Sequence, residues 1–289
     1  MKLPSLTVVG LGCIGGSVAK AVTPNGGGFT RGWSTSSEDN ALARAMDFDV
    51  PECTLAESMS DARLVIIAVP VQAIAEVAAV ALRAAPEDAT IIHCGGVQSR
   101  TALGLDEATH ARVIGAHPLA GSHDSGFAAS REDLFRGCTV SIESRASEEV
   151  REWMKWLWGH VGAARLEYRT ADEHDAMMAW VSHLPQLAST ALAATFAAEH
   201  VDPESVGPGA RDTTRLAASA FEQWSSLLQA QPKVLDAALA KLESNIGSVR
   251  HALAHGDQRA LRKLWDSARE WRRSAEPQTV EPQTVEPQA

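Results

Sequence analysis

The sequence predicts an α/β domain, built on a mostly parallel sheet, followed by an all-α domain. Strand-like apolar runs alternate with helical runs over the first 170 of the 289 residues, and a glycine-rich turn follows the first strand-like run. This alternation is typical of βαβ units. After Thr170, alanine, leucine and charged residues dominate and strand-like runs stop. We therefore expect an α/β domain at residues 1–170 and a helical domain at residues 171–275.

Each element of the first domain is predicted from its own run of residues. Short β-branched or apolar runs predict strands at residues 5–9, 29–33, 64–69, 90–94, 112–116, 139–142 and 165–168. Alanine-rich or amphipathic runs predict helices at residues 16–22, 41–46, 74–84 and 147–158.

The second domain carries one long apolar seam. Its members recur at spacings of 4, 3, 4, 3 and 4: Leu235, Leu239, Leu242, Ile246, Val249 and Leu253. Such a seam fits the interior of a helical bundle or a helix that packs on a second subunit, and we expect a homodimer. Residues 276–289 repeat EPQTV with three prolines and no apolar period, which predicts a disordered tail.

Charge and cysteine content exclude several classes of protein. The 26 basic and 36 acidic residues give a net charge of −10, which disfavours binding to nucleic acid or to an anionic membrane. No apolar run reaches the length of a membrane span. Four dispersed cysteines without a CxxC pair predict reduced thiols in a cytoplasmic protein. His174, Asp175 and His183 do not form an HExxH pattern, so no metal site is expected.

The glycine-rich turn at residues 10–15 reads GLGCIG, a G-x-G-x-x-G pattern between a strand and a helix. Gly10 permits the tight turn, and Gly12 lets the backbone approach a pyrophosphate. Gly15 lets the helix pack close to the strand. Ile14, between Gly12 and Gly15, is a further expected cofactor contact. The start of the following helix attracts phosphate groups. The first domain is therefore predicted to be a Rossmann-type dinucleotide-binding domain.

The end of the second strand predicts which dinucleotide is bound. An acid about 20 residues beyond the glycines would bond the adenosine ribose of NAD. Ser34 and Thr35 stand there instead, with Arg31 nearby. Hydroxyl groups and an arginine suit a 2′-phosphate, so we expect NADP in preference to NAD. Glu38 and Asp39 are contrary signs if the strand ends later.

Two further strands end in candidate contacts, since ligands of such sheets bind at the carboxyl ends of the strands. The strand at residues 64–69 leads into three expected cofactor contacts, Ala68, Val69 and Pro70. His117 follows the strand at residues 112–116, in a loop that carries Pro118 and Gly121. A lone histidine is more often structural, but its place in such a loop makes His117 a candidate for chemistry as well.

Residues 5–272 resemble the prephenate and arogenate dehydrogenases of tyrosine biosynthesis. The resemblance rests on five stretches in the order of the family: VVGLGCIGGSVA (8–19), IIAVP (66–70), GAHPLAGSHDSG (115–126), HDAMMAWVSHLP (174–185) and RDTTRLAASAFEQW (211–224). The third and fifth stretches are specific, because other Rossmann dehydrogenases lack that pair. Members of the family oxidise the C4 alcohol of a cyclohexadienyl ring, pass hydride to a nicotinamide and release CO₂.

The resemblance implies roles for individual residues. His117 takes the place of the family histidine that accepts the 4-hydroxyl proton, a role that suits an imidazole with a reference pKa of about 6.5. Arg215 takes the place of the arginine that binds a substrate carboxylate. Asp212 and Ser219 are expected on the same helix face as Arg215. His183 is expected beside the substrate or in an interhelical hydrogen bond.

The sequence departs from the family pattern around the substrate. Gly96 replaces a serine that helps to orient the catalytic histidine, so water or another side chain would have to steady His117. Gln98 replaces a lysine, and Gln186 replaces a second histidine. His123 stands where prephenate-using members often carry glutamate, and we include Gly96 and His123 among the expected substrate contacts. The choice between prephenate and arogenate stays open.

Two other functions share parts of this pattern. A β-hydroxyacid or imine reductase would share the glycine motif and a helical second domain, but would not need both specific stretches. A non-catalytic NADP-binding regulator would keep the glycines but could lose His117 and Arg215, and both are present.

Overall fold

The computed structural model describes residues 5–23, 30–121 and 124–275. The chain divides into two compact units, Met1–Leu235 and Asp236–Ala289. The first unit contains the sheet and the helices that follow it, and the second contains most of the long helix α12 and helix α13. The expected disordered tail at 276–289 and the expected contact His123 lie outside the described residues.

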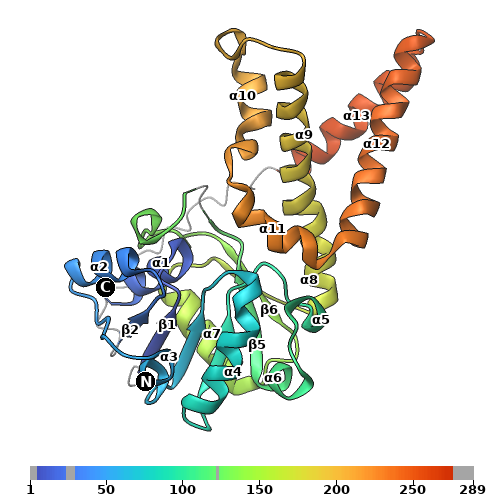
Figure 1. Cartoon of the computed structure of the whole chain (residues 1–289). Coiled ribbons are helices and arrows are strands. Elements are labelled where there is room, and N and C mark those ends of the chain that lie inside the picture. The colour runs from blue at the N-terminus through green and yellow to red at the C-terminus, as the bar shows by residue number, and fades with distance from the viewer. Residues whose placement is uncertain (1–4, 24–29, 122–123, 276–289) are drawn as a thin grey trace, which may run out of the picture. The chain divides into compact units, whose positions relative to one another are not determined.

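The described residues form one seven-stranded sheet in the order β2-β1-β3-β4-β5-β6-β7 (Figure 1). The strands are β1 Leu6–Val9, β2 Thr30–Trp33, β3 Leu64–Ile67, β4 Thr90–His93, β5 Val113–Pro118, β6 Thr139–Glu143 and β7 Arg165–Arg169. Strands β1 to β5 pair in parallel, β6 runs antiparallel to β5, and β7 is parallel to β6. The carboxyl ends of the first five strands therefore meet at one edge, as the sequence predicted.

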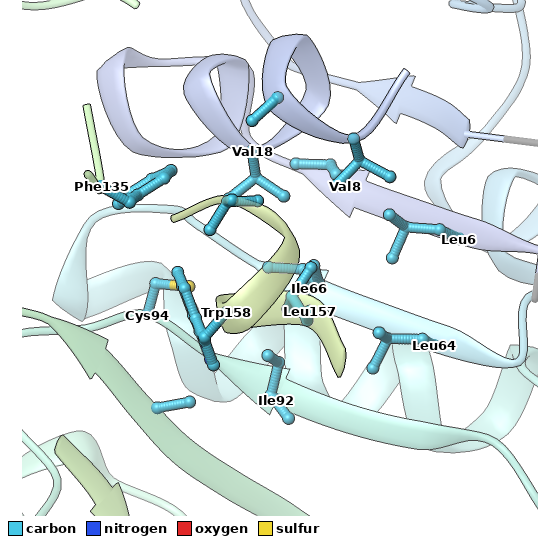
Figure 2. Packing of buried hydrophobic residues seen from close by; sticks show 14 of the residues in the cluster. Leu6, Val8, Val18, Leu64, Ile66, Ile92, Cys94, Phe135, Leu157 and Trp158 are labelled. Atoms are coloured by element: carbon cyan, nitrogen blue, oxygen red, sulfur yellow. The ribbon is translucent and has the colours of Figure 1, made fainter. Parts of the chain in front are cut away.

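Helices cover both faces of the sheet because buried parallel strands are apolar on both faces. Helices α1 (Cys13–Val22) and α7 (Glu148–His160) supply one core cluster, with Val18, Leu157 and Trp158 packed over alternate strand residues (Figure 2). Helices α3 (Leu55–Met59) and α4 (Ile74–Ala84) supply the cluster on the other face. The alternation is clear in β3, where Leu64 and Ile66 join the first cluster and Val65 and Ile67 the second.

Three short helices were not predicted: α3, α5 (Arg100–Leu103) and α6 (Glu107–Arg112). Helix α3 is set by a capping box, in which Thr54 and Glu57 bond each other's backbone N–H groups. Helix α2 (Ser37–Ala45) begins four residues before the prediction, because the Ser36 side chain caps it.

The helical part begins with α8 (Ala171–Met178), a π-helical turn (Ala179–His183) and α9 (Leu184–Ala198). It continues through α10 (Pro208–Thr214), a 3₁₀ turn (Arg215–Ala218), α11 (Phe221–Ala230), α12 (Pro232–Ala254) and α13 (Gln258–Ser274). Pro185 has no N–H to donate, and its ring would clash with a carbonyl one turn earlier in a regular helix. The wider π turn lies directly before it. In the described part of the chain, no helix combines the length and apolar character that crossing a membrane requires.

Candidate active site

The glycine loop between β1 and α1 leaves room for a ligand on one side only. Gly10 has a φ of +94°, and a Cβ there would lie 2.5 Å from the Ala68 carbonyl oxygen. A Cβ on Gly15 would lie 1.9 Å from the Gly10 oxygen. A Cβ on Gly12 would meet no atom within 4 Å, so its backbone faces open space. This loop therefore fits a pyrophosphate at the start of α1.

A cavity of about 740 Å³ opens in front of this loop. Eight of the nine expected cofactor contacts line it: Gly10, Gly12, Ile14, Ser34, Thr35, Ala68, Val69 and Pro70. Gly15 is buried behind the loop, where it serves the close packing of α1. The carboxyl ends of β1, β2 and β3 thus supply one continuous wall.

The ribose end of this cavity carries hydroxyl groups, as expected. The Ser36 N–H donates to Ser34 Oγ at 3.1 Å. Asp39 also lines the cavity, but its Oδ1 already accepts the Phe127 N–H at 2.7 Å. Arg44 lies in the wall of an adjacent cavity of about 730 Å³, together with Ser34 and Thr35.

The expectation that Arg31 lies at the ribose is wrong. Its guanidinium is 2.8 Å from Asp61 and 3.5 Å from Asp49, and it donates to the Ser58 carbonyl at 3.2 Å. Two carboxylates therefore hold this cation away from the cavity wall. Among the described residues, Arg44 is the cation that stands beside the serine cluster.

A second cavity, of about 530 Å³, adjoins the first. His117 and Gly96 line it, so the structure brings together these two expected contacts. Six residues line both cavities: Ile14, Val69, Pro70, Ala120, Gln223 and Leu227. The end of β5 thus places the His117 ring beside the space that faces the glycine loop.

A chain of buried side chains holds the His117 ring, and the sequence did not predict it. His117 Nδ1 lies 3.0 Å from His174 Nε2, and His174 Nδ1 lies 2.7 Å from Asp175 Oδ1. The backbone N–H groups of Gln98 and Ser99 each donate to the Asp175 carboxylate at 2.9 Å. His174 is thus the side chain that steadies His117, in place of the family serine that Gly96 replaces. The only sequence signal was the His-Asp pair at the start of a helix.

Burial keeps the site histidines neutral. Burial, with the nearby rings of His174, His93 and His183, lowers the pKa of His117 to about 3. Burial likewise lowers the pKa of His93 to about 3, and it lowers the pKa of His183. His117 therefore stays unprotonated far below its reference pKa of about 6.5, as an acceptor of protons must.

His183 lies within the helical part and lines neither cavity. Its side chain is 1% exposed and meets Trp224 edge to face, with ring centroids 6.1 Å apart. Its Nδ1 has no hydrogen-bond partner. The expected interhelical hydrogen bond at this nitrogen is therefore absent.

Arg215, Asp212 and Ser219 do not share a helix face, contrary to expectation. Helix α10 ends at Thr214, Arg215 opens the 3₁₀ turn, and Ser219 has an extended backbone. The i+4 spacing of an α-helix therefore does not apply. Arg215 and Asp212 are exposed, form no ion pair within the described residues, and line neither cavity.

The turn that carries Arg215 is fixed by two polar side chains of α9. Gln186 Nε2 donates to the Leu216 carbonyl at 2.9 Å, and the Ala217 N–H donates to Ser189 Oγ at 3.2 Å. Gln186 thus anchors the segment after Arg215. Across residues 5–23, 30–121 and 124–275, no group of three or more His, Cys, Asp or Glu side chains is arranged to hold a metal ion.

Comparison with known proteins finds two family models that together span most of the chain. The model of the prephenate dehydrogenase nucleotide-binding domain matches residues 18–163, and that of the prephenate dehydrogenase dimerization domain matches residues 170–266.

Individual proteins show the same likeness along their length. A prephenate dehydrogenase of Lactococcus lactis is 25% identical over 282 residues, which covers 95% of this chain and 78% of that protein. A cyclohexadienyl dehydrogenase of Zymomonas mobilis is 26% identical over 265 residues, covering 87% and 89%. The fold matches that of a prephenate dehydrogenase from A. aeolicus, solved with hydroxyphenyl propionate and NAD+, with a TM-score of 0.85, 24% identity and coverage of 96% and 99%.

Proposed function

The chain belongs to the prephenate dehydrogenase family, and on that premise we propose that its two adjoining cavities bind a nicotinamide dinucleotide and a cyclohexadienyl substrate side by side. The chain is an NAD(P)-dependent dehydrogenase that catalyses the oxidative decarboxylation of prephenate or arogenate. One observation carries the placement of the site: His117 lines a cavity that shares Ile14, Val69 and Pro70 with the cavity at the glycine loop.

His117 and the glycine loop have separate roles in this reaction. The bound dinucleotide supplies the acceptor for the hydride that leaves C4 of the substrate ring. The neutral His117 ring accepts the proton of the 4-hydroxyl as the hydride departs, so it stabilises the transition state more than the ground state. Gly10 and Gly12 would hold the pyrophosphate of the dinucleotide at the start of α1. Release of CO₂ then makes the ring aromatic.

Turnover assays test this function directly. Purified protein is mixed with prephenate or arogenate, each with NAD or NADP, and formation of the reduced nicotinamide is followed by absorbance. We expect turnover in at least one of these mixtures. Cofactor binding without turnover of either substrate would favour a non-catalytic dinucleotide-binding protein.

We expect a preference for NADP, because hydroxyl groups and not a carboxylate directly follow β2 in the cavity wall. Ser34 and Thr35 present hydroxyl groups, and Asp39 is already bonded to Phe127. Replacing Ser34 with Asp should lower kcat/KM for NADP by roughly 10- to 100-fold, since a carboxylate beside a phosphate costs several kcal/mol. Steady-state kinetics with both cofactors measure the change.

A control serine lies away from both cavities. Ser60→Asp adds the same charge at an exposed position that lines neither the cofactor cavity nor the adjacent one, and it should leave the preference nearly unchanged. A wild-type protein with clearly higher kcat/KM for NAD would overturn the proposed preference.

We also propose a homodimer through the helical part. In the predicted seam, Leu235 is buried and Leu242 and Val249 are half-buried, whereas Leu239, Ile246 and Leu253 are 38%, 52% and 63% exposed. Exposed apolar side chains in such a row are typical of an interface. Light scattering at micromolar concentration should give twice the chain mass of 30.8 kDa.

Two substitutions in α12 test whether the seam, and not the rest of the helix surface, forms the dimer interface. Ile246→Glu should shift the protein toward the monomer, because a buried unpaired charge is costly. Lys241→Glu changes an exposed residue of the same helix outside the seam and should leave the mass unchanged. A wild-type mass of one chain would contradict the dimer.

A further inference from the structure

Asp175 and His174 are adjacent residues of α8 that are both buried against the sheet domain. His174 is 0% exposed and Asp175 is 4% exposed. A buried carboxylate must be paired and hydrogen-bonded to be tolerated. Asp175 meets this demand with three donors, namely the His174 ring and the backbone N–H groups of Gln98 and Ser99. His174 in turn contacts the His117 ring, so His174 links Asp175 to His117.

We propose that Asp175, acting through His174, is the positioning device that keeps His117 Nε2 free to accept a proton. An ionised carboxylate only accepts hydrogen bonds, so His174 Nδ1 carries a proton and donates it to Asp175. His174 Nε2 is then bare and accepts from His117 Nδ1–H. The remaining nitrogen of His117 is therefore bare as well. One carboxylate thus fixes the tautomer of two rings in series.

The environment of the His117 ring makes this device necessary. Within the described residues, His174 is the only hydrogen-bond partner of the His117 side chain. On the other edge, a Cβ built on Gly96 would lie 3.6 Å from His117 Cε1 and 3.7 Å from Nε2, so the glycine leaves out a side chain that would stand beside the ring. Without His174, neither the tilt of the ring nor its tautomer would be set by a side chain.

The same chain supports the His117 ring while it holds the proton that the reaction releases. The O–H bond of the substrate breaks and an N–H bond forms at His117 Nε2, while the hydride leaves with the dinucleotide. The His117 Nδ1–H stays donated to His174 Nε2, and the Asp175 carboxylate stabilises the positive charge through the His174 ring. The added proton leaves Nε2 for solvent when the product departs, which restores the starting tautomers.

Asp175 also borders a third cavity, of about 640 Å³. This cavity shares no lining residue with the two cavities of the site, and Ser99, Thr101 and Asp172 are among the residues that line it. This positioning role rests on the proposed role of His117, so the test must separate the two.

The first arm of the test is kinetic. In Asp175→Asn, the amide can donate to His174 Nδ1, which reverses both tautomers and puts a proton on His117 Nε2. We expect kcat to fall by about 10²–10⁴-fold, with KM and cofactor affinity changed by less than about threefold. His174→Phe keeps a ring of similar shape without nitrogen atoms, and kcat should fall by at least about tenfold.

A matched control lies one turn away. Asp172→Asn makes the same change on α8 at an exposed residue that lines the same third cavity but has no contact with His174. It should keep wild-type kcat. Thermal unfolding of all three variants, measured by circular dichroism, checks that each is folded.

The second arm does not depend on turnover. Nitrogen NMR of protein labelled in its histidine rings reports which ring nitrogens carry protons, and the signals of His117 are identified by their loss in His117→Asn. The wild type should show a bare Nε2 and Asp175→Asn a protonated one. A wild type with this pattern but no turnover would refute the proposed function and leave the positioning role standing. Wild-type kcat in folded Asp175→Asn and His174→Phe, or an unchanged tautomer, would overturn the positioning role.

Discussion

Replacing His117 with Asn is expected to lower kcat by about 10²–10⁴-fold, because the variant loses the group proposed to accept the 4-hydroxyl proton. Asparagine keeps polarity and approximate size, so KM should change little. The ring lines the substrate cavity and not the glycine loop, so cofactor binding, followed by fluorescence, should survive the substitution.

The pH profile provides a second measurement on the same residue. Burial lowers the pKa of His117 to about 3, so the ring remains neutral when the pH falls through about 6.5. Loss of kcat/KM caused by protonation of His117 should therefore appear only toward pH 3, far below the range of an exposed histidine. A His117→Asn variant that keeps more than about a tenth of wild-type kcat would require another acceptor, with His183 and His93 the next candidates.

Replacing Arg215 with Ala is expected to raise KM for the substrate by roughly 10- to 150-fold, since a charged hydrogen bond contributes about 1.5–3 kcal/mol. The guanidinium is exposed and has no ion pair in the described ranges, so it is available to a carboxylate. Its turn is held to α9 by Gln186 and Ser189, which would limit the entropy lost on binding. Cofactor affinity should stay nearly intact.

Arg211 supplies the control for this prediction. It is an exposed arginine of α10, four residues before Arg215, and its Nε donates to the Val206 carbonyl. Arg211→Ala should leave KM close to that of the wild type. An unchanged KM in Arg215→Ala would remove this residue from the substrate site.

The sequence was sufficient for the elements whose signal is local. Each expected strand is present to within a few residues, because apolar runs such as residues 64–67 are buried on both faces of the sheet. The glycine loop was equally predictable, since the motif places glycine at positions 10 and 15, where a Cβ would clash with backbone oxygen atoms. Helix α3 escaped prediction although its capping box, Thr54 and Glu57, is visible in the sequence.

The features of the site that the sequence analysis missed or predicted wrongly depend mostly on contacts between residues distant in sequence. His117 and His174 are 57 positions apart, and nothing local marks one as the partner of the other. Arg31 was placed near the ribose by proximity in sequence, but two carboxylates that lie later in the chain, Asp49 and Asp61, hold it. The face shared by Asp212 and Ser219 assumed an unbroken helix, whereas the backbone changes to a 3₁₀ turn at Arg215.

The π turn between α8 and α9 has a consequence for insertions and deletions. It holds more residues per turn than an α-helix, so it changes the rotational phase between the two helices by roughly the 100° that one residue spans. His174 and Asp175 lie before this phase step, and Gln186 and Ser189 lie after it. Losing a single residue there, such as the exposed Val181, would turn one group away from its partners even though every side chain of both groups remained. Length, more than residue type, is thus the constraint at this turn.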